Sequence, residues 1–322
     1  MPIIITPDSF DHWLQLKSED VSSTEVSALF GISPYSTEFE LFHQKLSGDI
    51  YTIEDNERMY CGRMMEDTIA QMASEQLGIK VRRLKTYFRH DTVAHMSSSF
   101  DYEIVGNLDR LQEKYGKLKG PGLLEIKNVD GLVYRNEWSE DEAPAHIEAQ
   151  VQHQLEVSNR NWAIIACLSG GNSMHIMFRE RNRKIGKAMC ERINKFWEDI
   201  DKELMPEPNY EKDADFIIEM YSDDQGEPVD ISEDISLRSM IVTYKELRAR
   251  YSELESATKA IKAEVFHRVG NASKLISSDG LTVSMTKTKD TPPTVITEDM
   301  IGTEIGGREG YRQFGISQRK VK

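Results

Sequence analysis

The segment at residues 124–127 constrains this chain most, because it sets an acid and a lysine two positions apart within an apolar run. Successive side chains of a β-strand point to opposite faces, so Glu125 and Lys127 are expected to share one face of a strand. A further acid, Asp101, follows Ser99 and Phe100, and we expect it on a neighbouring strand. Two carboxylates hold a hard divalent cation such as Mg²⁺ through oxygen, and a lysine can orient the attacking water. A solvated charge pair also gives this pattern, so the prediction of a site that cleaves phosphodiester bonds needs support from other segments.

An amphipathic helix is predicted at residues 60–73. Its apolar residues recur at helical spacing, at Met65, Ile69 and Met72. Glu66 lies at the edge of this apolar stripe, where an unpaired charge is costly to bury. It is either a surface side chain or a third carboxylate that the helix aims at the metal.

Three glutamines follow on a second short helix at residues 149–155, ahead of an apolar run at 162–168. Gln150 and Gln154 lie one turn apart and share a face of this helix. An amide both donates and accepts hydrogen bonds, so Gln150 is a candidate ligand for a phosphate oxygen or a metal-bound water. A polar helix surface would account for Gln154 alone, but less well for all three glutamines.

A candidate anion site precedes these segments. Ser22, Ser23 or Thr24 can cap a helix that is expected to begin near Glu25. Free backbone N–H groups at a helix start, together with a hydroxyl and a nearby cation, bind anions. Capping alone explains the hydroxyls, whereas the additional Lys17 favours phosphate binding.

In this order, the segments resemble the lambda-exonuclease, or YqaJ-type, viral recombinase family. The resemblance covers about residues 10–200 and rests on the patterns W-x-x-x-K, S-x-T-E, G-x-x-x-E, S-x-D, E-I-K and A-Q-V-Q-H-Q-L. It implies the PD-(D/E)XK nuclease fold, a restriction-endonuclease-like mixed α/β sheet flanked by helices. It also implies a phage-type alkaline exonuclease that degrades the 5′ strand of duplex DNA ends with Mg²⁺, for which Mn²⁺ can substitute. The product would be 3′ single-stranded tails for recombination by strand annealing.

The same resemblance assigns roles to single residues. Asp101 and Glu125 match the metal-binding acids, and Glu66 matches the helix-borne acid at the metal site. Lys127 matches the catalytic lysine, and Gln150 matches the active-site glutamine. We therefore expect these side chains to share one site.

A pocket for a terminal 5′-phosphate is implied at Lys17, Thr24 and Ser99. Lys17 stands where the family usually has an arginine, so a point charge replaces bidentate binding of the phosphate. We still expect these three side chains to receive the 5′ end.

The gap from Asp101 to Glu125 is long for the family. Within it, residues 113–122 are predicted to form the tip of a hairpin between two strands. Asp109 lies in this insert and is a rival metal ligand, although the S-x-D context favours Asp101.

The charge balance argues against DNA binding, because acidic proteins do not generally attract phosphate backbones. The chain has 54 acidic and 40 basic residues, a formal net charge of −14. Its basic residues are clustered, however, at residues 80–85, 179–187 and 319–322. A basic DNA path on an acidic exterior is compatible with this pattern.

Cysteine usage predicts a reducing cytoplasm, that of a bacterium or a phage-infected host cell. Cys61, Cys167 and Cys190 are scattered, without the spacing of a disulfide framework, a zinc site or an iron–sulfur cluster. No signal peptide is evident, and no apolar run is long enough to span a bilayer, so no membrane contact is expected.

The chain is predicted to have three parts. Residues 1–205 form the nuclease core, residues 206–232 an acidic linker or extended wrap, and residues 233–322 a helical arm with a small β tail. Apolar residues recur every three or four positions from Leu237 to Val265, which predicts a long helix with coiled-coil periodicity that ends near Gly270. This arm is either one antiparallel helical hairpin within a subunit or an extension that contacts a partner or another subunit.

A β-hairpin is predicted in the tail around Ser278-Asp279-Gly280. Residues 310–314, which join an aromatic side chain to an arginine, would dock a terminal strand or stack on DNA bases.

The implied partners are double-stranded DNA ends, a single-strand annealing protein and further copies of this chain. The family suggests a trimeric ring. Two other functions remain open from the sequence. One is a DNA endonuclease of the same fold, and the other is a non-catalytic recombination factor that binds DNA ends.

Overall fold

Strand β6 (Gly122–Val129), which carries Glu125 and Lys127, is the middle strand of a five-stranded sheet with the order β2-β5-β6-β7-β8. The computed structural model describes the following residues: 1–48, 50, 56–221, 227, 229–289, 294–295, 304–305 and 315–318. Strand β6 pairs antiparallel with β5 (Tyr102–Gly106) and parallel with β7 (Trp162–Ser169). The sheet is therefore mixed, as the sequence predicts.

The edges of this sheet are antiparallel. Strand β2 (Lys80–Arg83) pairs with β5, and β8 (Ser173–Glu180) pairs with β7. All eight residues of β7 are buried, which explains why the predicted apolar run at 162–168 shows no alternation. A second, small sheet has the order β1-β3-β4.

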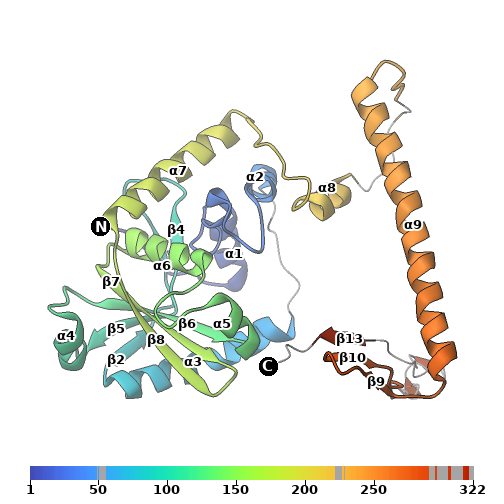
Figure 1. Ribbon diagram of the computed structural model, residues 1–322. Helices are drawn as coiled ribbons and strands as arrows, with labels where there is room; N and C mark the ends of the chain where they lie inside the picture. The colour runs from blue at the N-terminus through green and yellow to red at the C-terminus, as the bar shows by residue number, and fades with distance from the viewer. Residues whose placement is uncertain are drawn as a thin grey trace. The chain divides into compact units, whose positions relative to one another are not determined.

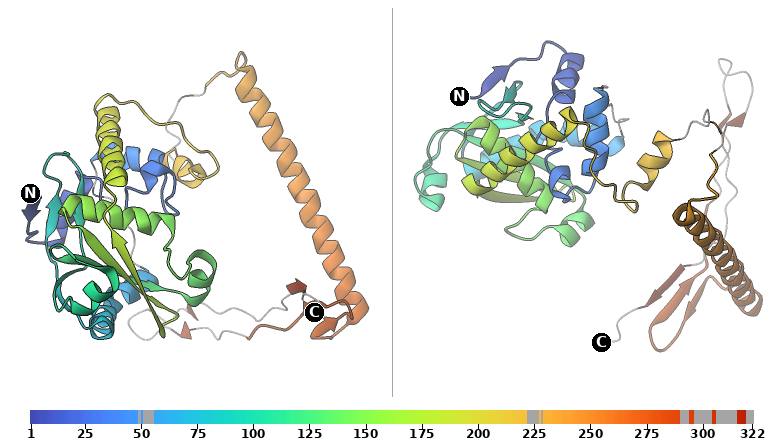
Figure 2. Two further views of the ribbon diagram at one scale, coloured as in Figure 1. Left: turned by 60° about the vertical axis from the view of Figure 1, so that its left-hand side comes forward. Right: turned by 90° about the horizontal axis from the view of Figure 1, so that it is seen from above.

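Helices cover both faces of the main sheet, so the predicted α/β architecture is confirmed (Figures 1 and 2). Helix α3 (Glu57–Leu77) packs on the face that carries Leu124 and Ile126. Helices α6 (Ala145–Ser158) and α7 (Arg183–Asp201) pack on the opposite face. Because side chains alternate along β6, Glu125 and Lys127 point toward α6 rather than α3.

The remaining helices and short strands surround this core. The helical elements are α1 (Phe10–Ser18), the 3-10 helix η1 (Ala28–Phe30), α2 (Glu38–Ser47), α4 (Asp109–Tyr115), α5 (Gly131–Glu137) and α8 (Ala214–Met220). The strands of the small sheet are β1 (Ile3–Ile5), β3 (Tyr87–Arg89) and β4 (Ser97–Ser99). Helix α8 lies within the range expected to be an extended linker.

The connection between β5 and β6 differs from the prediction. The two strands do pair antiparallel, but helix α4 and a following loop join them instead of a hairpin tip. The helix forms because Leu111 is buried in the core that α3 shares with the sheet, and Leu108 and Tyr115 pack against the same core. This spacing of three and four positions belongs to a helix, and the sequence analysis did not use it.

The chain divides into two compact units, Met1–Asp224 and Gln225–Lys322. The second unit contains helix α9 (Ile235–Val269), a single 35-residue helix that is followed by Gly270 with φ of 59°. The predicted long helix is confirmed. The alternative of an antiparallel helical hairpin is wrong, because α9 runs without a break.

Strands β9 (Lys274–Ile276) and β10 (Leu281–Ser284) form the predicted hairpin after α9. Strand β13 (Gly315–Gln318) adds to β10 on its other side. The same unit contains the strand pair β11 (Thr294–Val295) and β12 (Glu304–Ile305). The aromatic and basic residues at 310–314 and 319–322 lie outside the described residues.

Candidate active site

The acid and the lysine of β6 form a direct ion pair. Lys127 Nζ lies 2.6 Å from Glu125 Oε1. Glu125 is buried and Lys127 is half-buried. Burial by itself lowers the pKa of Lys127, but the carboxylates of Glu125 and Asp101 outweigh it and raise that pKa above its usual value. The lysine is therefore a fixed cation at neutral pH.

Asp101 stands beside this pair at the start of β5. Its Oδ2 accepts a hydrogen bond of 2.8 Å from the backbone N–H of Ile126, which fixes the carboxylate against β6. Burial first, and the charge of Glu125 second, raise the pKa of Asp101 well above its ordinary range. Two acids that repel each other in a buried setting form a place where a divalent cation would relieve the repulsion.

Helix α6 supplies amides to both oxygens of Glu125. Gln150 Nε2 donates to Oε1 over 2.6 Å, and Gln154 Nε2 donates to Oε2 over 2.7 Å. Gln150 Oε1 in turn accepts a hydrogen bond of 3.0 Å from Lys127 Nζ. Thus Gln150, Glu125 and Lys127 each contact the other two.

Gln154 is the site residue that the sequence analysis did not assign, and the interpretation of it as helix surface is wrong. Only 2% of Gln154 is exposed. Gln152 points elsewhere, to the chain between β8 and α7, where it bonds the backbone of Glu180 and Asn182. The spacing of four that links Gln154 to Gln150 was the available signal.

Glu66 projects from α3 and forms an ion pair with Arg83 of β2, at 2.6 Å between Oε2 and Nη2. Burial is the largest influence on Glu66 and raises its pKa, Arg83 opposes this, and Glu125 adds to it. Glu66 is therefore within electrostatic reach of Glu125 and Lys127, but its direct partner is an arginine.

The residues expected to receive a 5′-phosphate are linked through α1. Trp13 Nε1 donates to Ser99 Oγ over 2.9 Å, and Lys17 Nζ lies 5.6 Å from the centre of the Trp13 ring. Thr24 is exposed, and its Oγ1 lies 3.1 Å from Ser22 Oγ.

No α-helix begins near Glu25 in this described part of the chain, which corrects the prediction. Residues 22–25 instead form a turn, in which the Glu25 carboxylate accepts hydrogen bonds from Ser22 N–H and Oγ over 2.8 and 2.7 Å. Lys45 completes the turn by donating to Glu25 Oε1 and to the carbonyl oxygen of Lys17. Burial by itself raises the pKa of Glu25, but Lys45 and then Lys17 outweigh it and lower that pKa.

Asp109 is the first residue of α4 and is exposed on that helix. It makes none of the contacts of Glu125, whereas Asp101 is bonded to the backbone of β6. The geometry favours Asp101 as the acid that accompanies Glu125.

The donor set at β6 fits a hard divalent cation, because its oxygen ligands are carboxylates, and the pKa of Asp101 stays raised although Lys127 offsets part of the repulsion from Glu125. Another group, made of His90, Glu156 and Cys190, has ligand atoms within 4.8 Å of one another. Its bonding does not suit a metal, because His90 Nδ1 accepts two backbone N–H bonds and so leaves the ring proton on Nε2. Arg181 also binds both oxygens of Glu156.

Comparisons with known proteins find a matching domain family and a relative. Residues 12–161 match the YqaJ-like viral recombinase domain. The uncharacterized protein YqaJ of Bacillus subtilis (strain 168) is 25% identical over 269 residues, which cover 82% of this chain and 79% of the relative. The resemblance found in the sequence is thereby confirmed.

The comparison with solved structures finds exonucleases at low sequence identity. The alkaline exonuclease LHK-Exo from Laribacter hongkongensis is 18% identical and matches with a TM-score of 0.48, over 60% of this chain and 93% of that one. LHK-Exo in complex with dAMP matches with a TM-score of 0.48 at 16% identity, over 66% and 98%. A phage-related exonuclease from Haemophilus somnus 129PT gives a TM-score of 0.38 at 11% identity, over 57% and 96%.

Proposed function

We propose that this chain, whose residues 12–161 match the YqaJ-like viral recombinase domain, is a Mg²⁺-dependent 5′-to-3′ exonuclease that acts on linear double-stranded DNA. Its product would be 3′ single-stranded tails for recombination by strand annealing. The observation that carries the proposal is the closed set of contacts among Glu125, Lys127 and Gln150, beside the raised pKa of Asp101.

In the proposed mechanism, Asp101 and Glu125 would hold one or two Mg²⁺ ions, and Glu66 and Gln150 would complete the site directly or through water. When bound, Mg²⁺ would stabilise the negative charge that develops on the phosphate and on the leaving oxygen. Lys127 orients the attacking water, since its ammonium is held between Glu125 and Gln150. Gln154 acts as a positioning residue, because it holds the second oxygen of Glu125.

The polarity of the proposed reaction comes from the 5′-phosphate pocket. A cation at Lys17 and hydroxyls at Thr24 and Ser99 would bind a terminal phosphate, which has a second negative charge that an internal phosphodiester lacks. The connection from Lys17 through Trp13 to Ser99 supports a shared site.

We further propose that the protein works as an oligomer with a single-strand annealing protein as partner, and that Mn²⁺ can replace Mg²⁺. The part of the chain that the structure describes contains no helix that is long and apolar enough to cross a membrane.

One assay tests the proposal. Purified protein is incubated with linear, nicked and closed-circular duplex DNA, with Mg²⁺ and with EDTA, and the products are resolved on gels with each strand end labelled separately. The proposal requires digestion of linear DNA only, from the 5′ end, with Mg²⁺ only. Cleavage of closed circles would identify an endonuclease, and binding to ends without cleavage would identify a non-catalytic factor. Asp101→Asn should abolish digestion while Asp109→Asn leaves it intact.

A further inference from the structure

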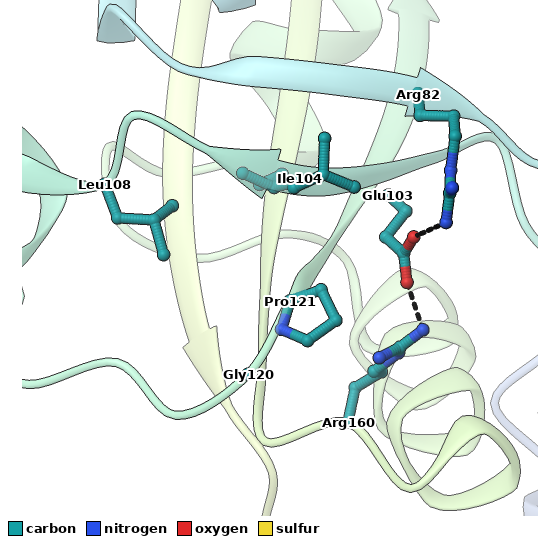
Figure 3. A pocket seen from close by; sticks show the side chains of 8 residues that line it. Arg82, Glu103, Ile104, Leu108, Gly120, Pro121 and Arg160 are labelled. Carbon is teal, nitrogen blue, oxygen red and sulfur yellow. Dashed lines mark hydrogen bonds and ion pairs between the residues drawn. The ribbon is translucent and has the colours of Figure 1, made fainter.

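A cavity of about 420 Å³ lies on the main sheet at the start of β6 (Figure 3). Figure 3 shows Arg82 and Arg160 on two sides of Glu103, with both guanidinium groups directed at its carboxylate. We name this the Arg82 cavity. Its other lining residues are Ile104, Val105, Leu108, Gly120 and Pro121.

The Arg82 cavity has a surplus of positive charge. Glu103 is 2% exposed and accepts a hydrogen bond of 2.5 Å from Arg82 and another from Arg160. Two guanidinium groups therefore share one carboxylate, and the remaining lining residues are uncharged. This local surplus occurs in a chain whose formal net charge is −14.

Donors remain available in the Arg82 cavity after Glu103 is bound. A guanidinium has five N–H groups, and Glu103 accepts from one nitrogen of each arginine. The side chain of Arg82 is 67% exposed, so its other donors face solvent. Arg160 Nε also has no acceptor among the residues that the structure describes, but it is buried, so Arg82 supplies the accessible donors.

The ligand chemistry that fits is a phosphate group attached to an apolar body. Arginine donors match phosphate oxygens in a forked geometry. Ile104, Leu108 and Pro121 add apolar surface beside the two arginines, against which a sugar can pack. A volume of about 420 Å³ falls within the range of small-ligand sites.

The position of the cavity relates it to the proposed metal site. Glu103 lies in β5 and Asp101 directly precedes that strand, so the two residues are about 7 Å apart along the chain. One DNA strand advances about 3.4 Å along the helix axis per nucleotide. A phosphate bound near Asp101 and a phosphate in the Arg82 cavity can therefore belong to one strand, a few nucleotides apart.

We propose that the Arg82 cavity binds a phosphodiester of the DNA strand near the cleavage site, and this inference rests on the proposed function. It also gives a role to part of the basic cluster at residues 80–85. Within that cluster, Arg83 is engaged by Glu66 and Asp67, whereas Arg82 faces the cavity. Arg82 is the residue to test, because Glu103 keeps its contact with Arg160 when Arg82 is replaced.

The test measures DNA binding without cleavage. Full-length protein in EDTA is titrated into fluorescent duplex DNA at several salt concentrations, and binding is followed by anisotropy. Arg82→Ala and Arg82→Gln should weaken binding about tenfold at low salt and should reduce the slope of log affinity against log salt by about one. Arg82→Lys should retain the slope, since it keeps the charge. Arg110→Ala removes an exposed arginine of α4 that does not line the cavity, and it should match the wild type.

Wild-type affinity and slope in both Arg82→Ala and Arg82→Gln overturn the inference. Melting temperatures of all variants show whether a loss of binding reflects unfolding. If replacing Arg82 unfolds the protein, Arg82→Lys also loses binding, whereas Arg110→Ala retains it.

A second experiment adds a deoxynucleoside monophosphate or inorganic phosphate and measures thermal stabilisation. Stabilisation that depends on Arg82, together with an unchanged DNA slope, assigns the cavity to a free nucleotide and overturns the assignment to the strand. The proposed function fails separately, if wild-type protein binds DNA but does not digest it with Mg²⁺.

Discussion

Lys127 is the residue whose contacts bear most directly on catalysis. Its ammonium lies 2.6 Å from Glu125 Oε1 and 3.0 Å from Gln150 Oε1. Lys127→Ala should reduce the rate of DNA digestion by about a hundredfold to a thousandfold, the usual cost of removing one fixed electrostatic donor. DNA affinity in EDTA should remain close to that of the wild type. Lys195→Ala, on the exposed side of α7 and outside the basic clusters, serves as the control for loss of one lysine charge. Digestion at the wild-type rate by Lys127→Ala would remove this lysine from the mechanism.

Lys17 is expected to determine the preference for phosphorylated ends. Charge-assisted hydrogen bonds to a phosphate contribute about 1.5–3 kcal/mol each. Wild-type protein should therefore digest 5′-phosphorylated ends faster than 5′-hydroxyl ends, and Lys17→Ala should abolish most of that difference by slowing the phosphorylated substrate. Structural damage would slow both substrates equally, so the ratio of the two rates is the quantity to measure. Equal rates on the two substrates in the wild type would mean that residues other than Lys17, Thr24 and Ser99 determine the polarity.

Single residues were predictable from the sequence where spacing alone decided their direction. Alternation along an apolar strand was sufficient to bring Glu125 and Lys127 to one face, and the structure pairs them. The partner of Glu66 was not predictable, because it depends on how α3 crosses β2 and so on the position of Arg83. Gln154 was missed for a related reason: whether an amide one turn from Gln150 meets solvent or Glu125 depends on the depth at which α6 packs.

The contact between α6 and α7 depends on a glycine. A Cβ atom added to Gly186 would lie 2.0 Å from Glu156 Oε2, and Glu156 cannot move freely because Arg181 binds both of its oxygens. Gly186→Ala should therefore destabilise the first unit by about 2 kcal/mol, even after the helix propensity of alanine is counted. The measurement is the first transition in urea denaturation.

Gly62→Ala provides the matched control for that substitution. Gly62 also lies inside a helix, α3, and an added Cβ atom would meet nothing within 4 Å. This variant should be more stable than the wild type by about 0.4–1 kcal/mol, because alanine restricts the unfolded chain. If both variants gain stability, the steric argument for Gly186 is wrong.

Helices and strands with a clear period of apolar residues were predictable from the sequence. Elements that form because of tertiary contacts were not. The sequence was sufficient for the helix around residues 60–73, the glutamine helix, the strand at 162–168 and the long arm, each of which has a sustained pattern. Helix α4 has only two turns, so its few apolar residues do not show a clear period in the sequence. It is defined by the packing of Leu111 into the core. Residues 22–25 mimic a helix start because the Glu25 carboxylate accepts from the Ser22 backbone N–H, which is one half of a capping box, although the chain continues into η1.

At the scale of the whole molecule, a buried histidine should make stability depend on pH. His153 of α6 is fully buried, and neither ring nitrogen has a hydrogen-bond partner among the described residues. Burial first, and His90 second, lower the pKa of His153 to about 3. The unfolded chain titrates near 6.5 and binds more protons than the folded chain between these values. Stability is therefore complete above about pH 6.5 and is lost as the pH falls toward 3.

The expected loss from His153 between pH 7 and pH 5 is about 2 kcal/mol. Burial also lowers the pKa of His43 and of His146, so they add to the same trend. His153→Leu should make the free energy of unfolding less dependent on pH in this range, as measured by denaturation at each pH. His267→Gln, on the exposed part of α9, is the control for the loss of one histidine. An unaltered slope in His153→Leu would show that His153 binds a proton as readily in the folded protein as in the unfolded chain.

Lys127, Glu125 and Gln150 each contact the other two, so no one of these side chains can move without changing two contacts. Two of these residues belong to β6 and the third to α6, so the ammonium group is located by the strand and the helix together. We therefore expect a shift of α6 against β6 to move the ammonium of Lys127 relative to Glu125. Because a side chain added at Gly186 would press on Glu156 of α6, its effect should reach the ammonium that orients the attacking water.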